Sequence, residues 1–198
     1  MYDLHLHLMG HGFKFSRKLL TSYLLKAEIL NLEALGFVDH FPKVHRKYKK
    51  MRAELFEASN HVEFPIYYGC EINYPFSEKI PRHFDYVMVH IQRGVDLSDA
   101  LFGLRGKRVD LIAHPCQFGS TCRNLDEALD LALENGLALE LNLKRFDSTP
   151  KELYSKASKK GISLILGSDA HSPEEMIYDS LLLEKLEFTK FENIEFLD

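Results

Sequence analysis

The sequence predicts an α/β fold, a distorted (β/α)7 barrel of the TIM-like class. Short apolar runs alternate with amphipathic stretches along the chain, which is typical of parallel strands joined by crossover helices. Polar residues recur at the expected carboxyl ends of the strands: His7, His40, Glu71, His90, His114, Asn142 and Asp169. In a barrel those ends converge on one face, whereas an open sheet would spread them along its width. Since eight units usually need about 250 residues, a chain of 198 residues favours about seven.

The length and composition predict a single domain covering residues 1–198. No apolar run reaches the roughly 18 residues that a membrane helix needs, and the chain opens on an expected strand rather than on a secretion signal. We therefore expect a cytoplasmic location and no membrane association. The net charge of −4 does not favour a protein that coats duplex DNA. These numbers leave the oligomeric state open.

Cysteine usage gives a separate expectation. Cys70, Cys116 and Cys122 form an odd set without Cys-x-x-Cys spacing. We expect free thiols, as in a reducing compartment, rather than a disulfide framework.

The first half of the chain contains four expected strands. In the first, Tyr2–His7, His5 and His7 share a face because alternate residues of a strand point the same way. The neighbouring leucines, Leu4, Leu6 and Leu8, are expected on the other face. Apolar residues at helical spacing predict a helix at Ser16–Leu35, with Ser16 as its N-cap and Gly36 just beyond its end. The other expected elements are strands at Gly36–His40, Phe64–Asn73 and Phe84–His90 and a basic helix at Lys43–Asn60.

The second half continues the alternation. The expected strands are Val109–His114, Ala138–Asn142 and Ser163–Asp169. The expected helices are Leu97–Leu104, Asn124–Asn135, Pro150–Lys160 and Pro173–Leu186.

Histidine is the unusual residue type, with ten in the chain and no tryptophan. Two imidazoles side by side, such as those of His5 and His7, form half of a metal site, and Asp169 and His171 repeat the same spacing. Further histidines fall at expected strand ends or in the loops that follow them. Neutral imidazoles suit Zn, Fe and related ions, and carboxylates can bridge two of them. The remaining histidines, expected on the surface, are His45, His61 and His83.

The ordered motifs resemble one known family. They are Asp3-x-His5-x-His7, His11, Asp39-His40, Gly69-x-Glu71, Val89-His90, Ala113-His114-Pro115, Glu140-x-Asn142 and Gly167-Ser-Asp169-Ala-His171-Ser. This set resembles the PHP family, the polymerase and histidinol phosphatase domains, over residues 3 to about 175. The His-x-His pair alone is a weak signal, whereas the ordered set closed by Gly-Ser-Asp-Ala-His is specific. One departure is Gly10-His11-Gly12, where many members carry Ser-Asp-Gly.

The resemblance implies a PHP-type barrel with three divalent metal ions, whether Zn, Mn or Fe. The first ion would be held by His5, His7, Glu71 and Asp169. The second would be held by Glu71, His90 and His114, so that Glu71 bridges the first two. The third would be held by His11, His40 and His171. Asp3 and Asp39 are expected to accept hydrogen bonds that orient ligand imidazoles.

The implied chemistry is phosphoester hydrolysis. A hydroxide held between the first two ions would attack phosphorus in line, and the third ion would bind the phosphate. Asp169 or a neighbouring histidine, His171, would pass a proton to the leaving alkoxide. Arg93, Arg123, Lys144 and Arg145 follow the site motifs in sequence. We expect Arg145 and Arg93 to bind the substrate phosphate, because arginine can do so through two hydrogen bonds.

The leading prediction is a phosphomonoesterase for a small phosphorylated substrate, and specifically histidinol-phosphate phosphatase of histidine biosynthesis. A PHP-type phosphodiesterase, exonuclease or nucleotide phosphatase is the alternative, and a nuclease would need a basic track for the strand. One basic cluster wraps its helix and is expected to be solvated: Lys43, Arg46, Lys47, Lys49, Lys50 and Arg52. A metal-dependent amidohydrolase would often bridge its metals with a carboxylated lysine, where this chain has Glu71. The nine candidate ligands disfavour a non-catalytic PHP module.

Overall fold

Seven parallel strands form one sheet in chain order in the computed structural model, which describes residues 2–9, 15–42 and 47–176. The strands are β1 (Tyr2–Leu6), β2 (Ala34–His40), β3 (Ile66–Tyr74), β4 (Val87–Ile91), β5 (Leu111–Ala113), β6 (Ala138–Asn142) and β7 (Leu164–Gly167). The first and last strands meet, since the backbone N–H of His7 donates to the carbonyl of Ala170 at 2.9 Å. The sheet is therefore a nearly closed barrel, and the prediction of an α/β TIM-like barrel with seven strands is confirmed.

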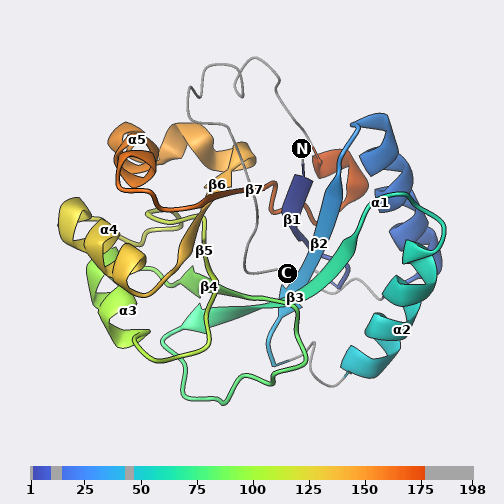
Figure 1. The fold of residues 1–198 in the computed structure, drawn as a ribbon, viewed down its shortest axis with the longest axis horizontal. Helices are drawn as coiled ribbons and strands as arrows, with labels where there is room; N and C mark the ends of the chain where they lie inside the picture. The colour runs from blue at the N-terminus through green and yellow to red at the C-terminus, as the bar shows by residue number, and fades with distance from the viewer. Residues whose placement is uncertain (1, 10–14, 43–46, 177–198) are drawn as a thin grey trace.

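Helices surround the barrel, with α1 and α2 on one side and α3, α4 and α5 on the other (Figure 1). They are α1 (Arg17–Ile29), α2 (Tyr48–Ser59), α3 (Leu97–Gly103), α4 (Leu125–Glu134) and α5 (Lys151–Lys159). Short polar side chains cap three of them by accepting a backbone N–H of the first turn, which would otherwise be unpaired. These N-caps are Ser16 for α1, Asp96 for α3 and Asn124 for α4.

The first helix ends earlier than the sequence predicted. Asn31 has a left-handed backbone with φ of 51°, and Leu32 donates its N–H to the carbonyl of Ala27 at 3.0 Å, which closes the helix. Asparagine tolerates this conformation better than most residues. Gly36 consequently lies inside β2 rather than beyond the helix. A Cβ there would lie 2.9 Å from the backbone Cα of Leu4, so glycine permits the close approach of β1 and β2.

The structure differs from the sequence-based prediction at three further places. Within the expected helix Pro173–Leu186, the described residues form a 3-10 turn, η4 (Pro173–Glu175), and residues 177–186 lie outside the described residues. An unpredicted 3-10 segment, η3 (Leu143–Ser148), follows β6 directly. His83 is half-buried rather than on the surface, because its ring packs 3.7 Å from that of Tyr48. His61 is exposed as expected, and His45 lies outside the described residues.

The basic cluster at the start of α2 is exposed where it is described. Lys47, Lys49, Lys50 and Arg52 are all exposed, as expected for a solvated face. Lys43 and Arg46 lie outside the described residues.

The interior of the barrel is filled by apolar side chains below the strand ends. This cluster includes Leu4, Val38, Met88, Leu111 and Ile165. Alternate strand residues share a face, so the residues two positions after Val38 and Met88, which are His40 and His90, lie above this layer. Polar side chains at the carboxyl ends thus rest on a packed apolar floor.

A register irregularity in β1 changes the expected faces of its leucines. The pairing of β1 with β2 shifts between Asp3 and Leu6, as in a β-bulge. Leu4 consequently packs in the barrel interior, whereas Leu6 and Leu8 pack under the helices. The three leucines do not share one face, because the bulge reverses the alternation within the strand.

Asp3 joins β1 to the segment after β7. The fully buried carboxylate accepts the hydroxyl of Ser168 at 2.6 Å, the N–H of Ser168 at 3.2 Å and the N–H of His5 at 3.0 Å. The sequence predicted that Asp3 would orient a ligand imidazole. In the structure it accepts hydrogen bonds from the backbone of His5 and from both donors of Ser168.

We predict that Asp3→Ala lowers the free energy of unfolding by about 2–4 kcal/mol, because three donors lose a buried acceptor. The exposed Asp147→Ala should change it by less than about 0.5 kcal/mol. Urea denaturation of both variants measures the difference. Equal stabilities would show that Asp3 does not hold the barrel closed.

The cysteine prediction is wrong in part. Cys116 and Cys122 form a disulfide, with their Cα atoms 5.6 Å apart. The chain folds back on itself between them, which sequence spacing alone did not reveal. Cys70 is a free, buried thiol as expected, and burial raises its pKa to about 12. Within the described part of the chain, no helix has the length and apolarity to cross a membrane.

Candidate metal centre

Glu71, near the end of β3, is the centre of a buried cluster at the carboxyl ends of the strands. Its Oε2 lies 3.0 Å from Nδ1 of His40, 3.6 Å from Nε2 of His7 and 4.0 Å from Nε2 of His5. Its Oε1 lies 3.6 Å from Nε2 of His114 and 3.8 Å from Nδ1 of His90. The two carboxylate oxygens therefore face two different groups of imidazoles, which is the arrangement that a bridging ligand requires.

The register of the strands explains how residues so distant in sequence meet. His40 pairs with Glu71 between β2 and β3, and His90 pairs with Ala113 between β4 and β5. His114 follows Ala113 directly and turns inward with a φ of 28°. Parallel strands in register thus bring their last residues to one level.

Asp169 completes the cluster from the segment after β7. Its Oδ1 lies 3.3 Å from Nε2 of His7, 3.6 Å from Nε2 of His5 and 3.8 Å from Nδ1 of His171. Its backbone is left-handed, with φ of 52°, a conformation that costs energy for most residues other than glycine. Such strain is typical of residues placed for function rather than for stability.

Charge and burial strongly perturb the titrating groups. Burial alone would raise the pKa of the Glu71 carboxyl, but the imidazoles of His114 and His40 hold it well below its usual range. Burial lowers the pKa of His7 to about 4. Burial also opposes protonation of His5, yet the carboxylates of Glu140 and Asp169 raise its pKa to about 10. The cluster therefore combines ionised carboxylates with imidazoles of very different basicity.

Four sets of three residues in the described part of the chain place one possible ligand atom each within 4.8 Å of one another. They are His5, His7 and Glu71; Glu71, His90 and His114; His7, His40 and His171; and His5, His114 and Glu140. The first two sets contain the ligands that the sequence assigned to a Glu71-bridged pair, except Asp169. In the third set His7 joins His40 and His171. His11, the remaining ligand predicted for the third ion, lies outside the described residues.

The donor set fits metal ions. Nε2 of His5 and Nε2 of His7 lie only 3.1 Å apart and point toward each other, and Nδ1 of His7 is buried without a hydrogen-bond partner. Nitrogen and carboxylate oxygen donors converging in this way suit Zn, Mn or Fe. Exposed acidic groups often cluster without a metal, but Glu71 and both histidines are buried.

Glu140 is a functional residue to which the sequence gave no role. Its Oε1 accepts from Nδ1 of His5 at 2.9 Å, and its Oε2 accepts the N–H of His114 at 2.5 Å. The first bond fixes the His5 ring so that Nε2 faces the cluster. A Cβ on Gly167 would collide with this carboxylate, so glycine makes room for it. The sequence signal that could have identified Glu140 is the presence of a carboxylate within an expected buried strand.

We predict that Glu140→Gln weakens metal affinity by about 10–100-fold, because the amide is a poorer acceptor for both His5 and His114. Competition with a chromophoric chelator measures the affinity. Glu63→Gln, which changes an exposed carboxylate, is the matched control. An unchanged affinity in Glu140→Gln would contradict the role of Glu140 in orienting ligands.

Asp39 lies near His7, but its carboxylate is too far from the imidazole for the hydrogen bond that the sequence predicted. Its Oδ1 is 3.9 Å from Nδ1 of His7 and accepts the N–H of Met9 at 2.7 Å. Burial raises the pKa of Asp39 to about 6.

A cavity of about 550 Å³ opens above the cluster. Besides the histidines and acids of the cluster, its lining residues include Asn73, Phe118, Lys144, Arg145 and Glu175. Of the two favoured phosphate-binding residues, Arg145 lines this cavity, whereas Arg93 is exposed and is not part of the lining. The other candidates form ion pairs, Lys144 with Glu175 at 2.7 Å and Arg123 with Asp96 at 3.3 Å.

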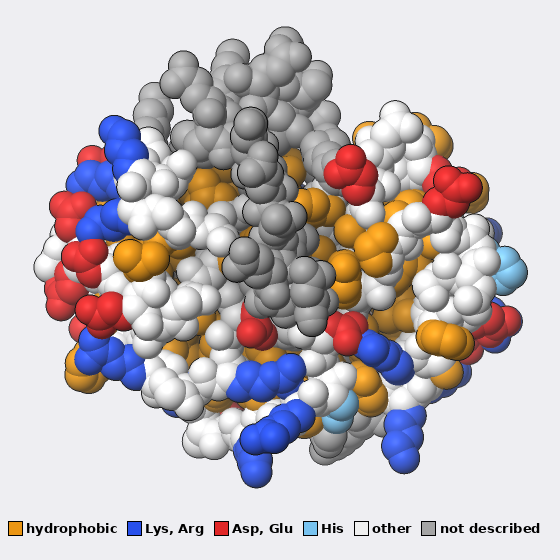
Figure 2. Space-filling model, in the orientation of Figure 1, with side chains coloured by type: hydrophobic (Ala, Val, Ile, Leu, Met, Phe, Trp, Pro, Cys, Tyr) orange, Lys and Arg blue, Asp and Glu red, His pale blue; other side chains and the backbone are white. Residues whose placement is uncertain are grey.

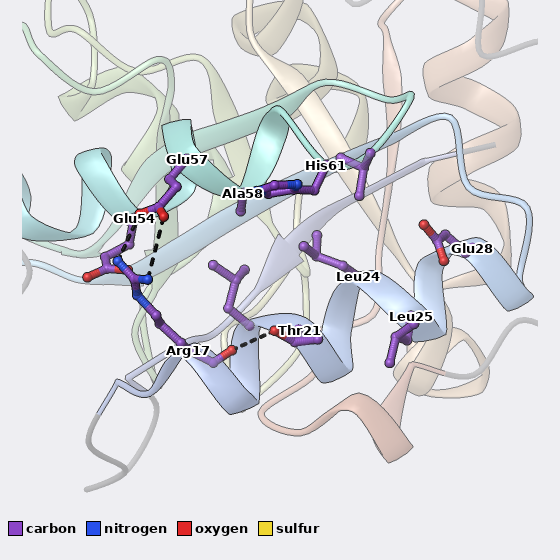
Figure 3. A pocket seen from close by; sticks show the side chains of 11 residues that line it. Arg17, Thr21, Leu24, Leu25, Glu28, Glu54, Glu57, Ala58 and His61 are labelled. Atoms are coloured by element: carbon purple, nitrogen blue, oxygen red, sulfur yellow. Dashed lines mark hydrogen bonds and ion pairs between the residues drawn. The ribbon is translucent and has the colours of Figure 1, made fainter.

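A second cavity, of about 360 Å³, lies between α1 and α2 on the outside of the barrel. Figure 3 shows its apolar lining of Leu24 and Ala58, and Arg17 at one end bonded to Glu54 and Glu57. None of the four possible ligand sets includes a residue of this groove.

No family model matches the chain, but the chain is similar to several known proteins. The chain is 24% identical to a protein of Clostridium novyi (strain NT) that is named a probable phosphatase, over 85% of this chain and 78% of that protein. It is also similar to a chain in the cryo-EM structure of archaeal Ribonuclease P with mature tRNA, with a TM-score of 0.61 and 17% identity. That match covers 94% of this chain and 81% of the other, and it supports the fold alone.

Fold and site together define a class: an α/β barrel whose strand ends carry several His and carboxylate clusters that could hold metal ions.

Proposed function

We propose that the protein is a metal-dependent phosphomonoesterase of the PHP type. The observation that carries this proposal is the position of Glu71, whose two oxygens face separate groups of imidazoles within 4.0 Å. Adjacent metal sites that share a carboxylate are common in enzymes that cleave phosphate esters. The resemblance to a named phosphatase supports the same chemistry.

Separate residues would hold the metal ions, bind the phosphate and transfer a proton. Two ions would be held by the sets that share Glu71, and a third by His11, His40 and His171. When bound, such ions lower the pKa of water and stabilise negative charge on phosphoryl oxygens. Arg145 reaches the cavity from η3 and binds the phosphate through its guanidinium N–H groups. Asp169 or His171 passes a proton to the leaving oxygen as the ester bond to phosphorus breaks.

A small substrate suits the cavity. Its volume of about 550 Å³ lies within the range of about 300–1,000 Å³ that small-molecule sites occupy. Among small phosphate esters we propose L-histidinol phosphate as the substrate, because of the sequence resemblance to the PHP family. Its hydrolysis would yield L-histidinol and inorganic phosphate. Action in the cytoplasm is part of the same proposal.

The alternative is a PHP-type phosphodiesterase, exonuclease or nucleotide phosphatase. A nucleic-acid strand needs a continuous basic groove. At the left of the face in Figure 2, Lys and Arg side chains lie among Asp and Glu side chains. That part of the surface offers no continuous basic strip for a strand. A non-catalytic binding module is the remaining alternative, and the set of buried ligands argues against it.

A phosphate-release screen tests the proposal. Protein loaded separately with Zn, Mn or Fe is incubated with histidinol phosphate, nucleoside monophosphates, sugar phosphates and single-stranded DNA. We expect release from monoesters, and the highest kcat/KM with histidinol phosphate. Activity only on DNA ends would favour the exonuclease, and no release from any ester by metal-loaded protein would favour the binding module.

A further inference from the structure

The loop that follows the ligand His114 also contacts Arg145, the arginine that lines the cavity. The loop is closed by the disulfide between Cys116 and Cys122 and carries Phe118. The guanidinium carbon of Arg145 lies 3.9 Å from the centroid of the Phe118 ring. The same ring meets that of His114 edge-on, with centroids 4.5 Å apart. Phe118 therefore lies between a candidate metal ligand and the cation.

The loop also holds the backbone of Arg145. Gln117 is buried, and its Nε2 donates to the carbonyl of Arg145 at 3.3 Å and to the hydroxyl of Thr149. Arg145 itself departs from helical geometry inside η3, with φ of −126°. Two neighbouring residues of one loop thus fix both ends of this arginine, Gln117 at the backbone and Phe118 at the guanidinium.

Arg145 contacts an aromatic ring, whereas Lys144 and Arg123 near the site pair with carboxylates. Lys144 is neutralised by Glu175, and Arg123 by Asp96. Among the described residues, no carboxylate forms an ion pair with Arg145, and its Nε is buried without a hydrogen-bond partner. A neutral ring holds a guanidinium by its face, which leaves the positive charge and the N–H groups at its edge available to an anion.

We propose that Phe118 is a positioning residue that holds the Arg145 guanidinium in the cavity for the phosphate group of the substrate. The inference rests on the proposed function, because it assigns Arg145 a phosphate ligand. It goes further than that function because it makes the affinity for phosphate depend on an aromatic side chain, Phe118, that contacts neither the phosphate nor a metal ion. Phe118 is 39% exposed, so its ring is not needed to fill the core.

The test compares Phe118→Leu, which removes the ring, with Phe118→Tyr, which keeps it. Two readouts are used: the dissociation constant of inorganic phosphate for metal-loaded protein by calorimetry, and KM and kcat for the best monoester. We expect Phe118→Leu to weaken phosphate binding and raise KM by about threefold to tenfold, with kcat within about twofold. Phe118→Tyr should retain the wild-type affinity. The matched control is Phe102→Leu, which removes a similar ring under Arg105 on α3 and should change neither readout.

A double-mutant cycle separates positioning from a general structural role. In an Arg145→Met background, Phe118→Leu should have no further effect on phosphate binding, because the cation that the ring holds is already absent. Effects that multiply independently would overturn the inference, as would a loss of affinity in Phe118→Tyr with metal content unchanged. If phosphate binding shows the coupling but no ester is hydrolysed, the proposed function fails and the positioning of Arg145 by Phe118 stands.

Discussion

Replacing Glu71 with Gln is expected to lower kcat/KM for phosphate release by about 10³-fold or more. The Glu71 carboxylate faces five imidazoles from four strands and the segments that follow them. Glutamine keeps the shape of the side chain but has one oxygen fewer and no charge. Losing several kcal/mol of charge stabilisation between two ions corresponds to about this factor. Metal analysis of the purified variant should show fewer ions bound per chain than in the wild type.

The control for this substitution is Glu63→Gln, which makes the same chemical change at an exposed site. It should retain both activity and metal content. Wild-type turnover and metal content in Glu71→Gln would refute a bridging role for this residue, since no other described carboxylate places its two oxygens toward both groups of imidazoles.

Removal of metal is expected to have the second large effect. Dialysis against a chelator should abolish phosphate release and lower the melting temperature, and addition of Zn, Mn or Fe should restore both. If ions are normally present at about 1,000 times their dissociation constant, their loss removes about 4 kcal/mol of stability. The physical cause is the buried cluster, in which the donor atoms of imidazoles and carboxylates converge within 4.8 Å of one another.

The experiment has an internal control. Chelation should shift the melting temperature of Glu71→Gln by less than it shifts that of the wild type, because that variant binds fewer ions. A chelator that leaves activity and melting temperature unchanged in the wild type would contradict the metal-dependent mechanism.

Local patterns predicted most of the secondary structure. The strand Ala138–Asn142 has the bounds that the sequence predicted, and α4 lies within the expected helix Asn124–Asn135, whose end residues cap it. The alternating runs and helical spacings depend only on neighbouring residues, so the sequence carries them directly. The end of α1 was wrong, because the left-handed turn at Asn31 was not anticipated.

The sequence by itself also determined the candidate ligands. Histidines and carboxylates at strand ends had to converge once the strands were parallel and closed into a barrel, and the structure brings together eight of the nine predicted residues: His5, His7, His40, Glu71, His90, His114, Asp169 and His171. His11 lies outside the described residues. Their roles as ligands remain a prediction that the substitutions above test.

Only the tertiary structure decided which side chains support those ligands. Glu140 orients His5 across 135 residues of sequence, Asp3 bonds to Ser168 across the closure of the barrel, and Arg145 rather than Arg93 lines the cavity. The disulfide and the bulge in β1 were likewise invisible to the local pattern. The physical reason is that periodicity specifies which face a residue occupies, whereas hydrogen-bond partners depend on register and loop paths that only the closed barrel sets.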